Sequence, residues 1–202
     1  MASSKTEICN LALSHLGIGE DIANVDTEQS TEASTMRRFY DIAKDECFRD
    51  FNWPFATKFA ALALVEEDPT EEWAFSYRYP SDCLRLRRVL SGLRNDNRQS
   101  RVPYKIGQDE QGLLIYTDME DAEVEYTVIS DDPSIYPVDF TMALSYKLAV
   151  YTAPRLAKGD PFGLAAKSAQ AYVLYMNKAA GTALNEQQDE EDTEAEAIRS
   201  RY

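Results

Sequence analysis

Apolar residues recur at three- and four-residue intervals in four stretches of the chain, a spacing that places them on one face of a helix. The first helix is predicted over residues 4–16, where Ser4 and Glu7 have the spacing of a capping box. The second is predicted to begin at Ser30 or Thr31, because either residue suits an N-cap. The chain therefore opens with two helices joined by a polar connection.

The second helix ends at a Trp-Pro step. Its apolar stripe, at positions 36, 40, 43, 47 and 51, runs up to this step. Pro54 has no amide hydrogen, and its ring disfavours the helical conformation at Trp53, so the helix is expected to end near Asn52. An apolar, extended segment follows at once. We therefore predict that Trp53 and Pro54 form a hinge between a helical part and a β part.

The middle of the chain has the two-residue period of β-strands. Trp73, Phe75, Tyr77 and Tyr79 alternate with smaller or polar residues, which predicts a strand with one aromatic face. Such a face is more often packed core than a stacking platform for single-stranded bases. Further strand-like segments cover residues 55–65, 83–90, 104–107, 113–117 and 123–130, and Pro69 is expected to break the first of them. These segments predict a small, mostly antiparallel sheet of about five strands.

The helical period returns near residue 139. A third helix is predicted between Pro137 and Pro154, and a fourth after Asp160 and Pro161, which suit an N-cap and a first-turn position. The predicted fold class is therefore α+β: a four-helix bundle with a small antiparallel β-sheet inserted between helices two and three, plus an extended acidic C-terminal tail. The bundle is assigned to residues 1–54 and 136–184, the β insertion to 55–135 and the tail to 185–202.

Charge is distributed unevenly along the chain. The net charge of -14 disfavours generic nucleic-acid binding, because affinity for phosphates comes from Lys and Arg. Residues 84–105 nevertheless hold seven basic residues and one acid, a local sum of +6. Residues 185–202 hold seven acids and two arginines, a local sum of -5. Unlike surfaces of this kind suit protein partners of matched charge, or other copies of the chain.

Length and composition are those of an ordinary globular protein of one domain, or of a domain with an insertion. No apolar run approaches the roughly 18 residues of a membrane-spanning helix, and no signal peptide is evident, so the protein is expected to act in the compartment where it is made. Cys9, Cys47 and Cys83 lie far apart in the sequence. An odd number of cysteines suits a reducing setting, and we interpret all three as small buried hydrophobes.

The sequence shows no catalytic constellation, and we predict no cofactor and no enzymatic activity. His15 is the only histidine; we interpret it as a last-turn residue favoured by the helix dipole, since no second histidine completes a zinc site. An enzyme remains an alternative, in which Asp131, Asp132 and Asp139, or residues 118–121, hold a hard metal ion. These acidic loops lack the ligand spacing of an EF-hand, and solvated turns are the simpler interpretation.

Three segments, in this order, carry a family resemblance: EICNLALSHLGIGEDIANVD, YDIAKDECFRDFNWPFATKFAALAL and WAFSYRYPSDCLRLRRV. Together they resemble the head-to-tail adaptor proteins of tailed bacteriophages, a group that includes the tail tubular protein A of short-tailed coliphages. The shared features are a helix ending in Leu-Gly, a helix ending in Trp-Pro-Phe-Ala, and the run Tyr-Pro-Ser-Asp-Cys-Leu-Arg. The resemblance covers residues 5–90, and beyond them only the order of elements agrees.

The resemblance implies a virion structural protein in the neck, between the capsid portal and the tail, assembled in the host cytoplasm. It implies a homo-oligomeric ring, commonly a dodecamer, that sits on the portal vertex, extends the DNA channel and offers a platform for tail attachment. The implied partners are the portal protein, further copies of the chain, a tail or nozzle protein, and genomic DNA that passes through without specific binding. An acidic channel suits that passage, because attraction at each phosphate makes DNA stick.

The resemblance and the charge pattern also suggest contact residues. In that family the C-terminal segment tends to reach along the portal, and the matching positions here are Ile198, Arg199, Arg201 and Tyr202. The basic stretch suggests an interface between subunits at Arg85, Arg87 and Arg88, because a ring needs two unlike patches that meet. An alternative function for so acidic a chain is a host-directed inhibitor that mimics DNA.

Overall fold

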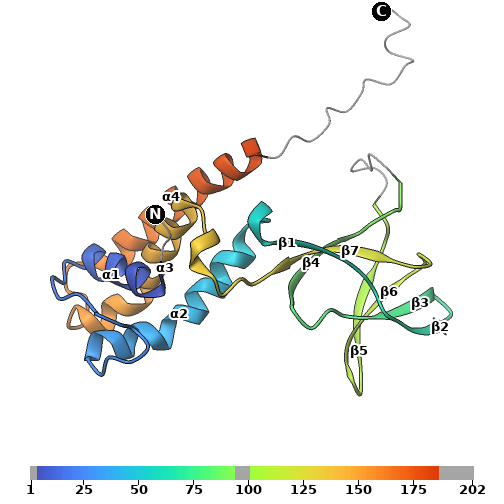
Figure 1. Ribbon diagram of the computed structural model, residues 1–202, viewed down its shortest axis with the longest axis horizontal. Helices are drawn as coiled ribbons and strands as arrows, with labels where there is room; N and C mark the ends of the chain where they lie inside the picture. Colours follow the sequence, from blue (N-terminus) through green and yellow to red (C-terminus); the bar gives the residue numbers. More distant parts are fainter. Residues whose placement is uncertain (1–3, 94–100, 187–202) are drawn as a thin grey trace, which may run out of the picture. The chain divides into compact units, whose positions relative to one another are not determined.

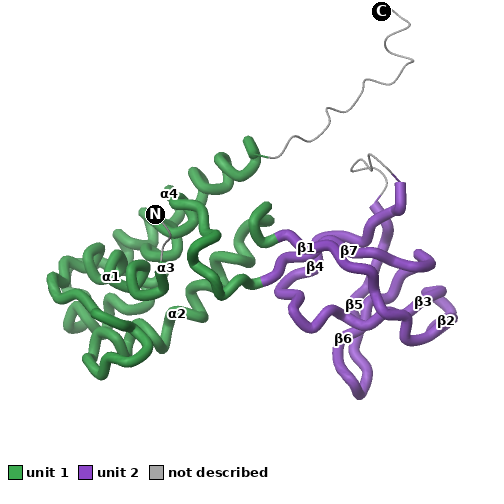
Figure 2. Tube along the Cα trace, in the orientation of Figure 1, with its two compact units in different colours: residues 1–56, 129–186 green, residues 57–128, 187–202 purple. Residues whose placement is uncertain are grey.

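The computed structural model describes residues 4–93 and 101–186, and these divide into two compact units (Figures 1 and 2). The helical unit comprises residues 4–56 and 129–186, drawn green in Figure 2. The β unit comprises the described residues between 57 and 128, drawn purple. One unit is therefore built from two distant chain segments, and the other from the stretch between them.

The helical unit holds α1 (Lys5–His15), α2 (Thr31–Asp50), α3 (Val138–Leu156) and α4 (Leu164–Glu186), with short 3-10 helices η1 (Pro54–Ala56) and η2 (Pro133–Ile135). The central element is α3, which packs against the other three helices. Its buried residues include neighbours such as Phe140 and Thr141, or Leu144 and Ser145, and so extend around its circumference. A helix buried on several faces needs partners on several sides, and the two chain segments supply them.

The starts of the first two helices agree with the sequence. The Ser4 hydroxyl accepts the Glu7 N–H at 3.1 Å and the Ser4 N–H donates to the Glu7 carboxylate at 3.4 Å, which confirms the predicted capping box. Ser30 is the N-cap of α2 and accepts the Ala33 N–H at 3.3 Å. The second helix ends at Asp50, two residues before the predicted position. These features depend on residues close in sequence.

Two predictions based on prolines are wrong. Pro154 lies inside the last turn of α3, which continues to Leu156; near a helix end its missing N–H removes only a terminal hydrogen bond. Pro161 does not occupy the first turn of α4, which begins three residues later at Leu164. Asp160 instead reaches forward, and its carboxylate accepts the N–H groups of Leu164 and Ala165 at 2.6 and 2.9 Å. Asp160 thus bonds to the first turn of α4, but it lies four residues before Leu164 and is not the adjacent N-cap that was predicted.

The β unit contains two antiparallel sheets. Its strands are β1 (Thr57–Ala61), β2 (Leu64–Thr70), β3 (Trp73–Arg78), β4 (Cys83–Val89), β5 (Lys105–Asp109), β6 (Gly112–Thr117) and β7 (Glu123–Val128). The first sheet has the order β1-β7-β4, and the second has the order β2-β3-β6-β5. The predicted hairpin between residues 104 and 117 is the β5–β6 pair.

The predicted fold class, a four-helix bundle with one small sheet, is wrong, because the described chain has four helices and two antiparallel sheets with seven strands. The error arises at residues 55–65, which hold a 3-10 turn, β1 and the start of β2 rather than one extended segment. Pro69 does not end this region, because β2 is an edge strand and an edge position tolerates a missing N–H. With β1 and β2 separate, each joins a different sheet.

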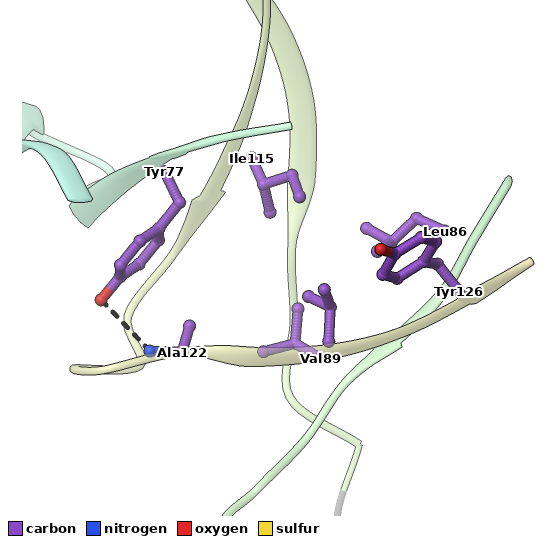
Figure 3. Close-up of a cluster of buried hydrophobic side chains, with 7 residues drawn as sticks. Tyr77, Leu86, Val89, Ile115, Ala122 and Tyr126 are labelled. Carbon is purple, nitrogen blue, oxygen red and sulfur yellow. Dashed lines mark hydrogen bonds between the residues drawn. The ribbon is translucent and has the colours of Figure 1, made fainter. Parts of the chain in front are cut away.

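Side chains from both sheets form one hydrophobic core (Figure 3). Tyr77 and Ile115 come from the second sheet, and Leu86, Val89 and Tyr126 from the first. The Tyr77 hydroxyl donates to the Met119 carbonyl at 2.8 Å and accepts the Ala122 N–H at 3.4 Å. These two hydrogen bonds hold the loop at residues 119–122, which precedes β7, against the core.

Candidate assembly surfaces

The Trp-Pro step lies in a well-packed turn at the end of α2. The Trp53 side chain is buried, and its indole N–H donates to the Cys47 carbonyl at 2.8 Å. Its ring meets those of Phe51 and Phe140 edge to face, with centroids 5.0 Å apart in each case. Pro54 opens the 3-10 turn that follows. Trp53 is thus attached to the last turn of α2, and the hinge role of Trp53 and Pro54 stays a prediction.

Phe140 is the centre of an aromatic cluster that joins the two segments of the helical unit. The rings of Phe48, Trp53, Phe55 and Tyr136 all have centroids 5.0 to 5.1 Å from that of Phe140. Three of these four rings come from the first chain segment, whereas Phe140 itself comes from the second. Each such pair contributes about 0.5–1.5 kcal/mol beyond the area it buries. The cluster therefore holds the helical unit together where the chain leaves it.

One face of α4 is apolar and open to solvent. Val173, Leu174 and Leu184 are 57%, 68% and 57% exposed, whereas the nearby Tyr172 and Met176 are buried. With Asn177 and Ala180 between them, Val173 and Leu184 follow a four-three-four spacing, which aligns them along the helix. We call residues 173, 174, 177, 180 and 184 the α4 face. Large apolar side chains exposed on one helix face are candidates for protein contact.

Two grooves flank the C-terminal half of α4, both within the helical unit. The first is lined by Trp53, Pro54, Phe55, Pro137, Asp139, Ala179, Thr182, Ala183 and Glu186. The second is lined by Asp50, Phe51, Tyr172, Val173, Met176, Asn177 and Ala180. Val173, Asn177 and Ala180 belong to both the second groove and the α4 face, so that a partner on this face gains a recess beside it.

The predicted interface arginines on β4 differ in their surroundings. The Arg87 side chain is only 5% exposed and donates to the hydroxyls of Thr57 and Thr127 at 2.6 and 2.9 Å, and to the Glu125 carboxylate at 3.3 Å. Burial lowers the pKa of its guanidinium, and Glu125 opposes that effect. Arg88, 46% exposed, pairs with the same carboxylate at 2.6 Å. Arg87 therefore ties the three strands of the first sheet together.

The two edge strands of the second sheet differ in charge. β2 carries the exposed acids Glu66, Glu67 and Asp68, whereas β5 begins with the exposed Lys105 and ends with Asp109, which pairs with Arg78 at 2.9 Å. Apolar side chains remain half-exposed at both edges: Leu64 and Val65 on β2, and Ile106 on β5 with Leu113 on β6. The sequence pattern did not identify these edges, because the order of strands in a sheet depends on pairing between distant residues.

His15 packs between helices. Its ring stacks on Tyr146 with centroids 3.7 Å apart, and its Nε2 lies 3.0 Å from the Ser145 hydroxyl, which itself donates to the Met142 carbonyl. Burial lowers the pKa of His15, which favours the neutral ring with Nε2–H as donor. The predicted role of His15, a charged ring that interacts with the helix dipole, is therefore not favoured here. The residue instead connects α1 to α3.

The acids considered as metal ligands have other partners. Asp131 pairs with Lys44 at 2.5 Å, Asp139 pairs with Lys178 at 2.9 Å, and Asp132 accepts the Ser134 N–H at 2.9 Å. Asp118, at the other candidate turn, accepts the Ala74 N–H at 3.0 Å. Within residues 4–93 and 101–186 no group of three or more His, Cys, Asp or Glu side chains is placed to hold a metal ion.

The cysteines are free, and two of the three are buried as predicted. Burial raises the pKa of Cys9 and of Cys47 to about 12 in each case. Cys83 is half-buried, and its thiol donates to the Tyr79 hydroxyl at 3.1 Å. Among the helices of the described segments, none combines the length and the apolar character that crossing a membrane requires.

The predicted portal-binding residues Ile198, Arg199, Arg201 and Tyr202 lie outside the described residues, and their role stays a prediction. No protein-family model matches the chain, and no curated protein matches it. Its function is therefore inferred from the surfaces of the described residues and from the sequence resemblance.

Proposed function

We propose that the chain is a non-enzymatic virion protein: a head-to-tail adaptor of a tailed bacteriophage that forms a ring on the portal vertex, extends the DNA channel and offers a platform to the tail. The observation that carries this proposal is the α4 face, an exposed apolar surface with a groove at its flank. Such a surface is typical of a subunit that is completed by a partner. The resemblance of residues 5–90 to adaptor proteins supplies the class of partner.

Charge supports the same function. In the described part of the β unit, the β2 edge is acidic and the β5 edge presents the exposed Lys105, and a ring needs two unlike patches on each subunit. The net charge of -14 suits a channel component that lets DNA slide, since 35 acids outnumber the 21 Lys and Arg residues that attract phosphates. In this proposal the portal contacts include the α4 face and the C-terminal residues 198–202.

The proposal is tested by mixing the purified chain with the portal protein of the same virus and measuring the mass of the complex by light scattering. The chain is expected to join the portal in several copies. The double variant Val173→Ser and Leu174→Ser is expected to bind at least tenfold more weakly, because it removes apolar area from the α4 face.

The matched control is Phe162→Ser, which removes an apolar side chain that is 75% exposed but lies outside α4. It should bind the portal like the unchanged chain. Failure of the unchanged chain to join the portal at any salt concentration would contradict the adaptor function. Equal weakening by the α4 variant and the Phe162 control would contradict the assignment of the α4 face.

A further inference from the structure

The two edges of the second sheet match one another. Cross-strand pairing aligns Lys105, Tyr116, Ser76 and Glu66 in one row across the four strands. The row therefore has a cation at the β5 edge and a carboxylate at the β2 edge. Because directly opposite residues point to the same side of a sheet, both charged groups lie on one face.

The neighbouring row is apolar from edge to edge. It runs from Ile106 through Ile115 and Tyr77 to Leu64. Ile115 and Tyr77 are buried in the core between the two sheets, whereas Ile106 and Leu64 are half-exposed. The apolar layer thus reaches both edges of the sheet and is left incomplete at each. A strand added at either edge would cover it.

Strand direction makes the edges compatible. The sheet has four strands, and every neighbouring pair is antiparallel. With an even number of alternating strands, β2 and β5 run in opposite directions. A second copy placed beside the first in the same orientation therefore brings its β2 antiparallel to β5 of the first copy. If Val65 stays unpaired at this joint, as it is against β3, the rows place Lys105 opposite Glu66 and Ile106 opposite Leu64 of that second copy.

The two edges also limit where pairing is possible. β5 pairs with β6 residue by residue, and the Tyr116 ring covers Gly107, where an added Cβ would lie 2.5 Å from Tyr116 Cε2. This regular backbone is open to a further strand. β2 has register shifts, a positive φ of 50° at Asp68 and then Pro69, features that protect an edge from pairing. One of the shifts leaves Val65 without a partner on β3, so within residues 64–67 pairing is restricted to Leu64, Glu66 and Glu67.

We propose that β5 of one copy pairs with residues 64–67 of β2 in a second copy, so that the second sheet continues from subunit to subunit. The choice of a second copy rests on the ring of the proposed function, because a joint between two unlike edges repeats from copy to copy, and a repeated joint forms a ring when its rotation closes. Lys105 also lies 3.6 Å from Glu72 of its own chain, but both side chains are about two-thirds exposed. Such an exposed pair is readily exchanged.

The test is disulfide trapping with the full chain. Ile106→Cys and Leu64→Cys are made separately, each with Cys83→Ser to remove the half-buried thiol. The two variants are mixed under oxidising conditions, alone and with the portal protein. Directly opposite cross-strand positions lie within disulfide reach, so a mixed dimer is expected. The chain that carries both cysteines should give a ladder of covalent oligomers.

The matched control replaces Leu64→Cys by Phe59→Cys, an exposed position on β1 of the other sheet. The proposed joint predicts no mixed product with this control. Equal yield with the control, or Ile106 to Ile106 dimers that outnumber the mixed ones, would overturn it. Portal binding without cross-linking would reject the joint between β5 and β2 but not the adaptor function. A ladder of covalent oligomers without portal binding would support the joint and contradict the adaptor function.

The charge match has its own test. Lys105→Glu should lower the yield of the mixed dimer by about two- to fivefold, the range that opposite-charge cross-strand pairs provide. Glu66→Lys in the other partner should restore it, since the pair is then reversed rather than removed. A yield that drops further in the double reversal would show that these two side chains do not meet, and would contradict the rows as aligned here.

Discussion

The helical unit and the β unit reach a closed core by different routes. The helical unit combines two segments, residues 4–56 and 129–186, and its aromatic cluster around Phe140 joins them. The β unit is one stretch of chain, and its core forms between strands of that stretch alone. The core of the helical unit therefore depends on contacts between residues far apart in sequence, and that of the β unit on nearer ones.

The two units also leave different surfaces incomplete. The helical unit exposes the α4 face, which lies beside a groove lined in part by Asp50 and Phe51 at the end of α2. The β unit exposes two sheet edges that combine apolar and charged groups. An apolar helix face provides affinity with little directionality, whereas strand pairing fixes register and direction. In the proposed function, the helical unit supplies the affinity for the portal and the β unit sets the order of the subunits.

Phe140→Ala is expected to have the largest effect, because it removes the ring on which the helical unit closes. The free energy of unfolding should decrease by about 3–5 kcal/mol, measured by urea denaturation with circular dichroism as the probe. Phe59→Ala, at an exposed position of the β unit, is the control and should change it by less than about 0.5 kcal/mol. Similar effects of the two variants would remove the distinction drawn between core and surface.

The two arginines that pair with Glu125 are expected to differ in their contribution to stability. This is tested with the variants Arg87→Met, at the buried partner, and Arg88→Met, at the exposed one. Loss of Arg87 should destabilise the chain by about 1–3 kcal/mol, since two threonine hydroxyls and one carboxylate lose a charged donor. Loss of Arg88 should cost at most about 1 kcal/mol, as solvent already screens its ion pair. Thermal unfolding of both variants decides the order. If Arg88 proves the more costly, Arg87 is not the strand connector described above.

Tyr77→Phe tests how strongly the Tyr77 hydroxyl stabilises the loop at residues 119–122. The variant keeps the ring in the core but removes the hydroxyl that bridges the Met119 carbonyl and the Ala122 N–H. A decrease of about 1–2 kcal/mol in the free energy of unfolding is expected, because backbone groups lose a partner inside the protein. Tyr126→Phe, whose hydroxyl bonds to the partly exposed Asp82, is the control and should be milder. Equal losses would argue against a special role for this loop.

His15 is expected to give the smallest effect, and only at low pH. Burial lowers its pKa below the ordinary value of 6.5, so the unfolded chain binds a proton more readily than the folded one. The stability that the neutral His15 contributes is complete above pH 6.5, and it is lost as the pH falls from 6.5 toward the lower pKa of the folded state. His15→Phe keeps the stack on Tyr146 without titrating. Denaturation midpoints at about pH 7.5 and about pH 5.5 should therefore differ less for this variant; an equal difference would contradict the assignment.

Local features of the fold were predictable from the sequence. The Ser4–Glu7 capping box and the Ser30 cap depend on hydrogen bonds between residues three apart, and the sequence places those residues correctly. The division into two sheets was not predictable, because it depends on pairings such as Thr57 with Thr127. The same limit applies to Pro69, which breaks a central strand but is compatible with an edge strand.

The candidate surfaces were predictable to a lesser degree. Charge counts indicated unlike acidic and basic regions, but burial decides which basic residues remain at the surface, and Arg87 is enclosed by threonines from β1 and β7. On α4, apolar residues occur on both sides of the helix, and the sequence does not tell the buried Met176 from the exposed Val173. Such distinctions need tertiary contacts, which local patterns do not contain.

The most direct test of the adaptor function is an image of the complex. The purified portal protein of the same virus, incubated with this chain, should show by electron cryo-microscopy an added ring of density in which neighbouring copies touch through their β units. A portal that shows no added density over a range of salt and protein concentrations would contradict the account.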